Sequence, residues 1–191
     1  NNTLSSITLN SGGATTNNTL ILQNGTTSIA QAINIQAQQG LLLDLQKNSN
    51  LTLAGLLTNA GSAGVNFGGT STLTSSITTT AGNTNISLAN GANSTITSDV
   101  STSGGETTLV FNGASTLTLY SGNGIITTNG GKTTLDFKSS NGILKGKLDT
   151  QGGETDIQLK GGAKGTITNT ISVSNGGVNN IKYNGTSALT L

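Results

Sequence analysis

The chain contains no cysteine, proline, histidine, arginine, tryptophan or methionine among its 191 residues. Without cysteine it can form neither a disulfide nor a thiolate metal site. Because proline cannot donate a hydrogen bond to a strand ladder, its absence favours a chain built from central strands. Histidine is the commonest acid/base catalyst and arginine the usual bidentate anion clamp. We therefore expect no enzyme activity and no cofactor.

Charge is also scarce, since charged residues make up 8% of the chain and the net charge is +1. Ordinary domains carry about 25% charged residues. No basic stripe is interleaved with aromatic residues, so we expect no nucleic-acid partner. Hydrophobic residues make up only 32%, but compositional disorder also requires a high net charge. No apolar run reaches the roughly 18–20 residues of a membrane-spanning helix.

What the chain does contain is a repeat. Two large apolar residues two positions apart recur eight times, and successive pairs start 21 to 26 residues apart. A period in the twenties with strand-like spacing inside each copy indicates a stacked solenoid. The pairs are Leu20/Leu22, Leu43/Leu45, Val65/Phe67, Ile86/Leu88, Leu109/Phe111, Leu135/Phe137, Ile157/Leu159 and Ile181/Tyr183.

Each copy is predicted to hold three short strands separated by three turns. In the fifth copy the strands cover residues 107–111, 115–119 and 125–128. Asn-Gly or Gly-Gly follows the first strand, for example Asn112-Gly113 and Gly68-Gly69, where a tight corner favours positive φ. A second pattern, four residues apart as in Leu53/Leu57, indicates inward positions of the next strands. This predicts an all-β, right-handed parallel β-helix of about eight coils of about 23 residues.

Two other folds share parts of this pattern. A leucine-rich repeat has a similar period but needs its own consensus and usually a helical segment in each copy. An antiparallel sandwich uses the same alternation and glycine turns, but it does not explain the constant period. Residues 28–39 also fit helical spacing, and we interpret them as strand.

Both ends of the chain resemble incomplete coils. Residues 1–13 resemble the second half of a coil, and residues 187–191 match residues 115–119. We expect residues 1–191 to be a single β-helix segment excised from a longer solenoid. Bare strand edges at its ends predict possible end-to-end self-association.

The charges are concentrated in the second half, where 12 of the 15 lie between Glu106 and Lys182. Glu106, Lys132 and Glu154 each follow a Gly-Gly turn, which predicts a column of alternating sign. Asp136, Gln158 and Lys182 are expected to form a second outward column. These columns are either a solvated face with weak ion pairs or a ligand-binding stripe.

Two further features were considered as sites. Tyr120 lies in the long corner of the fifth copy, so together with Glu106, Lys132 and Glu154 it is predicted as a possible contact surface. Asp149, Glu154 and Asp156 are close in sequence and could hold Ca²⁺ through oxygen ligands. Their spacing matches neither an EF-hand loop nor the RTX-type glycine-rich repeat, so we predict surface acids and no metal.

The unit Gly-Gly-x-Thr-x-Leu-x-Phe, at residues 104–111 and 130–137, resembles the β-helical passenger repeats of Gram-negative autotransporters. It is most similar to the vacuolating-cytotoxin-like proteins of Helicobacter. The resemblance implies type V secretion, an outer-membrane barrel at the C-terminus of the parent chain, and location at the outer-membrane surface or outside the cell, as for a virulence factor.

From the resemblance and the composition together we expect a non-enzymatic rigid rod in adhesion, with an unidentified host-cell surface or matrix component as partner. Two alternatives remain open at this point. One is a fragment of a vacuolating, pore-forming-type toxin that oligomerises on membranes. The other is a carbohydrate-active enzyme, because β-helices host such enzymes.

Overall fold

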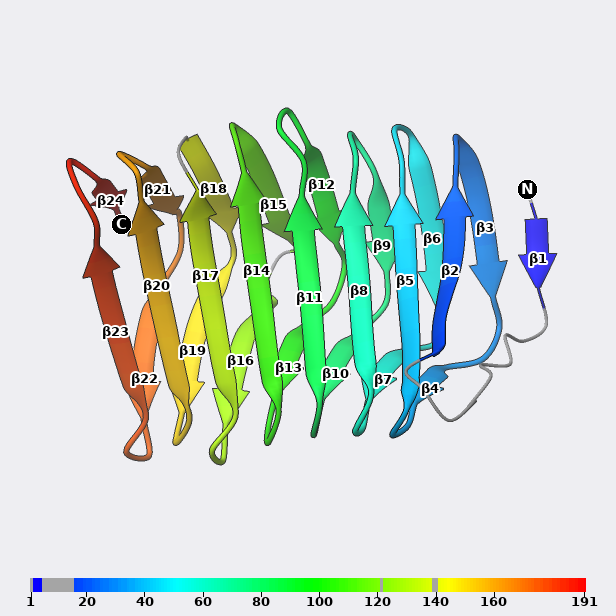
Figure 1. The fold of residues 1–191 in the computed structure, drawn as a ribbon, viewed down its shortest axis with the longest axis horizontal. Coiled ribbons are helices and arrows are strands. Elements are labelled where there is room, and N and C mark those ends of the chain that lie inside the picture. Colours follow the sequence, from blue (N-terminus) through cyan, green and yellow to red (C-terminus); the bar gives the residue numbers. More distant parts are fainter. Residues whose placement is uncertain (1, 5–15, 121, 139–140) are drawn as a thin grey trace.

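The computed structural model describes residues 2–4, 16–120, 122–138 and 141–191. Every regular element in these ranges is a β-strand, and every strand pairing between them is parallel. The strands form three sheets that run the length of the molecule (Figure 1). The predicted parallel β-helix is confirmed.

Each coil contributes one strand to each sheet. Sheet A contains β1 (Asn2–Leu4), β3 (Gly25–Ile29), β6 (Ser49–Leu53), β9 (Thr72–Thr74), β12 (Asn93–Ile96), β15 (Ser115–Leu119), β18 (Asn141–Lys145), β21 (Lys164–Ile167) and β24 (Ala188–Thr190). Sheet B contains β2 (Thr16–Leu22), β5 (Gln39–Leu45), β8 (Ser62–Phe67), β11 (Asn83–Leu88), β14 (Glu106–Asn112), β17 (Lys132–Lys138), β20 (Glu154–Lys160) and β23 (Val178–Tyr183). Sheet C contains β4 (Ile33–Ile35), β7 (Leu56–Thr58), β10 (Ile77–Thr79), β13 (Val100–Thr102), β16 (Gly124–Thr128), β19 (Lys147–Gln151) and β22 (Ile171–Ser174).

The chain passes from sheet B to sheet A to sheet C and then starts the next coil. In Figure 1 the strands of sheet B rise in front, the chain returns behind them, and each coil lies further from the N-terminus, which makes the winding right-handed. Seven complete coils are followed by β23 and β24 of another. The eight predicted apolar pairs lie on the eight strands of sheet B.

Large apolar side chains fill the lumen. Because side chains alternate along a strand, both members of each predicted pair point inward, and Leu109, Leu135 and Ile157 are fully buried. The register places like on like, so the rings of Phe111 and Phe137 stack with centroids 4.6 Å apart. Because the pairing is parallel and in register, the apolar residues of successive coils stack into continuous columns in the lumen.

A chain of buried threonine hydroxyls, not predicted from the sequence, lies where sheet C meets sheet B. Each threonine donates to or accepts from its neighbour at 2.7–3.4 Å, and the last, Thr150, donates to Asn179 Oδ1 at 2.6 Å. We call this chain the threonine ladder. In order of contact its members are Thr58, Thr84, Thr79, Thr107, Thr102, Thr133, Thr127, Thr155 and Thr150.

The corners follow the prediction in most coils. Gly113 adopts positive φ, as the Asn-Gly corner requires. Gly68 and Gly69 do not, so the prediction of positive φ is wrong there. The pair Leu53/Leu57 is also wrong, because Leu56 aligns with the inward Ile77 and Leu57 faces outward.

Two further predictions concern single segments. Residues 28–39 contain the end of β3, all of β4 and the start of β5, so the strand interpretation is correct there. In residues 1–13, β1 pairs with β3, and residues 1 and 5–13 lie outside the described part.

The last coil exposes the apolar columns that earlier coils bury. Ile181 is 43% exposed, although its register partner Ile157 is fully buried. Tyr183 is 55% exposed above the buried Leu159. The apolar interior is therefore open at this end of the described structure.

Candidate contact surface

The predicted charged column lies on the outer face of sheet B. Glu106, Lys132 and Glu154 begin β14, β17 and β20 and are register partners. Adjacent strands lie about 4.8 Å apart, so charges of alternating sign follow one another along the rod. The residues of the second predicted column, Asp136, Gln158 and Lys182, are also register partners, and this column lies four residues further along the same strands.

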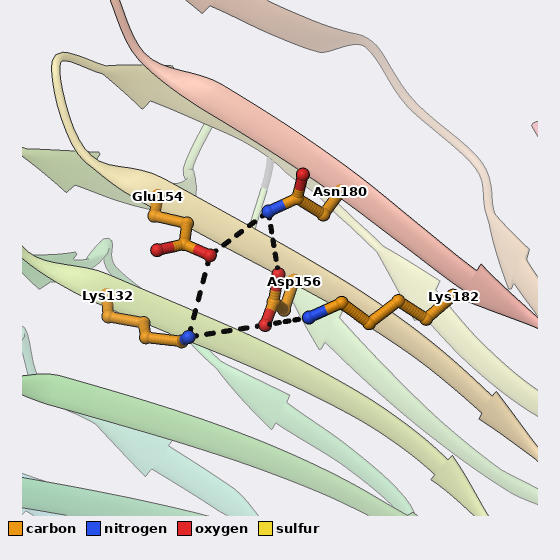
Figure 2. A network of polar contacts seen from close by, with 5 residues as sticks. All are labelled: Lys132, Glu154, Asp156, Asn180 and Lys182. Carbon is orange, nitrogen blue, oxygen red and sulfur yellow. Dashed lines mark hydrogen bonds and ion pairs between the residues drawn. The ribbon is translucent and has the colours of Figure 1, made fainter.

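Asp156 is the centre of a network of polar contacts on this face (Figure 2). Its carboxylate is 2% exposed and receives the Nζ of Lys182 at 2.9 Å and of Lys132 at 3.3 Å. Asn180 Nδ2 donates to Asp156 Oδ1 and to Glu154 Oε1, each at 3.0 Å. Strand β20 therefore supplies both acids, while the lysines and the amide come from the strands on either side.

The network changes the protonation equilibria of its members. Burial of Asp156 raises its pKa, but hydrogen bonds from Lys182, Asn180 and Lys132 outweigh burial and lower the pKa to about 2. The hydrogen bond from Lys132 to Asp156 outweighs desolvation and raises the pKa of Lys132 above its ordinary value. Both partners are therefore charged across the neutral range, as in a stable ion pair.

One more ion pair lies on the same face, next to the network. Lys160 Nζ contacts Asp136 Oδ2 at 3.0 Å, and the Asp136 side chain is 10% exposed. The other oxygen, Oδ1, is buried and has no hydrogen-bond partner among the described residues. The lysine side chains that contact the acids of this face remain 40–58% exposed, as is usual for long cationic side chains.

Two of the predicted contact residues lie outside the network. Glu106 is exposed and has no ion pair within the described part of the chain. Tyr120, 63% exposed, follows β15 at the corner between sheets A and C, whereas Glu106 begins a strand of sheet B. The predicted surface therefore divides into a charged face on sheet B and a separate aromatic side chain.

The three acids considered as calcium ligands are also divided between sheets. Asp149 lies on sheet C, where its carboxylate accepts hydrogen bonds from Gln151 Nε2 and Ser172 Oγ. Glu154 and Asp156 lie on sheet B with cationic partners. In the part of the chain that the structure describes, no group of three potential ligands gathers.

From the sequence, Asp156 was considered only as one of three candidate calcium ligands, and Asn180 was not considered as a site residue. A signal was present, because Asp156 lies two positions after Glu154 and therefore points to the same face. The register then pairs Asp156 with Asn180 on the next strand. What the spacing did not show was that lysines from two different strands reach the same carboxylate.

The arrangement is suited to polar contact with another molecule. Lys132 and Lys182 retain side-chain exposures of 40% and 58% while bound to Asp156. The described residues include no helix long and apolar enough to span a membrane. Comparison of the chain with protein-family models, curated proteins and solved structures found no match.

Proposed function

We propose that this chain is a non-enzymatic segment of an autotransporter passenger domain, acting as a rigid rod at the cell surface in adhesion or host interaction. The observation that carries the proposal is the unbroken parallel register of sheet B, from β2 to β23. Eight strands at about 4.8 Å spacing give a rod of roughly 40 Å. Such a rod holds an outer surface at a distance from its anchor.

The charged face supports a role in contact. Most of the charges of a weakly charged chain lie on its second half, and the network holds Lys132 and Glu154 at its surface. The Lys132–Glu154 pair, whose side chains are 40% and 43% exposed, contributes at most about 1 kcal/mol to stability. These two side chains therefore add little to stability and remain available for polar contact with another molecule.

Adhesion is tested with beads coated with the purified chain, applied to host epithelial cells and to immobilised matrix glycoproteins. We expect the beads to be retained, and retention to fall in the double variant Lys132→Ser/Glu154→Ser, which preserves net charge and the lumen. Asn34→Ala, an exposed position on sheet C, is the matched control. Retention no greater than that of uncoated beads would remove the adhesive role.

Export is tested separately by fusing the chain to an outer-membrane translocator barrel in a Gram-negative host. Protease added to intact cells should cleave the chain if it is displayed outside. The alternative function is an oligomerising toxin fragment that acts on membranes. Leakage of dye-loaded liposomes on addition of the chain would favour the toxin and count against the rod.

A further inference from the structure

Two hollows lie on the outer face of sheet B in the first half of the rod, away from the charged network. One, of about 370 Å³, is centred on Gly64 and bounded by Leu42 and Asn85. The other, of about 400 Å³, is centred on Gly68 and bounded by Asp44, Asn90 and Asn112. Gly64 lies within β8 and Gly68 directly follows it. The two hollows are therefore neighbours on the same face, and we call the pair the β8 trough.

The hollows lie beside Gly64 and Gly68, the two positions at which the chain carries no side chain on this face. Gly64 lies between Leu42 and Asn85 in the register. A Cβ added at Gly64 would lie 2.8 Å from Leu42 Cδ1, so the Leu42 side chain leans over the glycine. At Gly68 the nearest atom to an added Cβ is Gln46 Cα at 3.4 Å. The φ angle of Gly68 is not positive, so the backbone conformation at this position does not require glycine.

Polar groups converge on the second hollow. The register places Asn66 between Asp44 and Ser87 on its floor. Ser87 Oγ accepts from Asn112 Nδ2 at 3.0 Å, which leaves the Ser87 hydroxyl proton available. Asp44 Oδ2 accepts from Gln46 Nε2 at 3.1 Å. Within the described residues the Asn66 amide has no side-chain hydrogen bond, so it can both donate and accept.

We propose that the β8 trough binds a neutral oligosaccharide. Amide and carboxylate groups side by side can each bind a hydroxyl of a sugar ring, and Leu42 offers an apolar surface to the C–H face of a neighbouring ring. The size of the hollows lies in the range of ligand pockets, about 300–1,000 Å³. Among the described residues that line the trough Asp44 alone is ionisable, so an anionic glycan would meet repulsion and no countercharge.

This site goes beyond the proposed function, which rests on the charged face in the second half of the rod. It adds a ligand of stated chemistry on the same sheet. The binding chemistry does not depend on adhesion, and only its biological use does. The two proposals therefore fail in different experiments.

The test measures binding of the purified chain to immobilised neutral, sialylated and sulfated oligosaccharides, followed by calorimetry with the strongest neutral ligand. The variant Gly68→Gln fills the second hollow with a side chain. Glutamine is chosen because Gln46 occupies the equivalent position in the preceding coil. The variant Asn66→Ala removes the amide without filling the hollow. Asn34→Ala on sheet C is the matched control, and far-ultraviolet circular dichroism shows which variants keep the fold.

We expect binding to neutral glycans, weakened about tenfold or more in Gly68→Gln and Asn66→Ala and unchanged in Asn34→Ala. No neutral glycan bound, a preference for anionic glycans, or affinity unchanged in both folded trough variants would each overturn the inference. Glycan binding with no bead retention would refute the adhesive role and leave the trough site standing. Bead retention without glycan binding would refute the trough site and leave the adhesive role standing.

Discussion

The threonine ladder gives the sharpest prediction about what stabilises the rod, and Thr107 is the position to change. Its hydroxyl donates to Thr79 Oγ1 at 3.0 Å and accepts from Thr102 Oγ1 at 2.7 Å. The side chain is fully buried. Replacement by valine keeps the shape and the β-branched character, so the substitution isolates the hydroxyl.

The expected cost follows from those contacts. Two lost hydrogen bonds contribute about 1 kcal/mol each, and the stranded Thr102 hydroxyl adds about 1–3 kcal/mol for a buried donor without a partner. The extra methyl group offsets roughly 0.8 kcal/mol through greater apolar burial. We therefore expect Thr107→Val to lower the free energy of unfolding by about 2–4 kcal/mol.

Urea denaturation followed by circular dichroism measures this difference, provided the m-value is unchanged. The control is Thr108→Val, the next residue along β14, which faces outward and is half-buried. We expect that control to change stability by no more than about 0.5 kcal/mol. A Thr107→Val effect as small as the control would show that the ladder contributes no net stability.

A double variant separates the hydrogen bond from the packing of the threonine methyl groups. In Thr102→Val/Thr107→Val, the donor stranded by the single change at Thr107 is itself removed. Replacing both partners of a buried hydrogen bond by apolar groups is less costly than removing one. The double variant should therefore lose less stability than the sum of the two single variants, and simple additivity would contradict the ladder model.

Three further outcomes are expected. Because the pKa of Asp156 is lowered to about 2, its contribution to stability is present above its unfolded pKa of about 3.9 and is lost as pH falls towards 2. The urea midpoint, measured as a function of pH, should fall over this range, and the variant Asp156→Asn should show a weaker pH dependence. Gly142→Ala should cost about 1–3 kcal/mol, since its Cβ would lie 2.5 Å from Phe137 Cδ1, whereas Gly55→Ala, with ordinary contacts only, should be near neutral in the same assay. Ile181→Lys should reduce any concentration-dependent end-to-end association seen by analytical ultracentrifugation, because it places a charge on the open apolar end.

The β-helix was predictable because one local pattern recurs in every coil. Leu109 and Phe111 show strand alternation by themselves, and the same pair one period later shows what stacks upon them. The threonine ladder was missed because threonine is common on both faces of these strands. Thr107 and Thr108 are adjacent and chemically identical, and only the parity of Thr107 with Leu109 marks it as inward.

Corner length was the harder quantity to predict. The prediction for Leu57 was wrong because the corner between β6 and β7 contains one residue more than the corner between β9 and β10, when both are counted between register-paired residues. The register pairs Leu51 with Leu73 and Leu56 with Ile77, so the two inward residues are five apart in one coil and four in the next. A one-residue difference moves the neighbouring side chain to the opposite face.

The charged column was predictable for the same reason as the fold, since Glu106, Lys132 and Glu154 hold equivalent positions in the repeat. The burial of Asp156 was not. It depends on lysines from both neighbouring strands reaching across to one carboxylate, which the period of the repeat does not encode. Tyr120 is separate from this column because each coil has three sides, and Tyr120 lies at the corner between sheets A and C while the column lies on sheet B.

The inner and outer faces of one strand therefore carry different kinds of information. Inward residues must match the coil above and the coil below, so Leu109 tolerates little change without cost to both neighbours. Outward residues have no such partner requirement: the same face bears glycine hollows at Gly64 and Gly68 and an ion-pair network around Asp156. Because the fold constrains the outer face so weakly, the functional differences among coils should be found there, and variants on that face can test function while leaving the lumen intact.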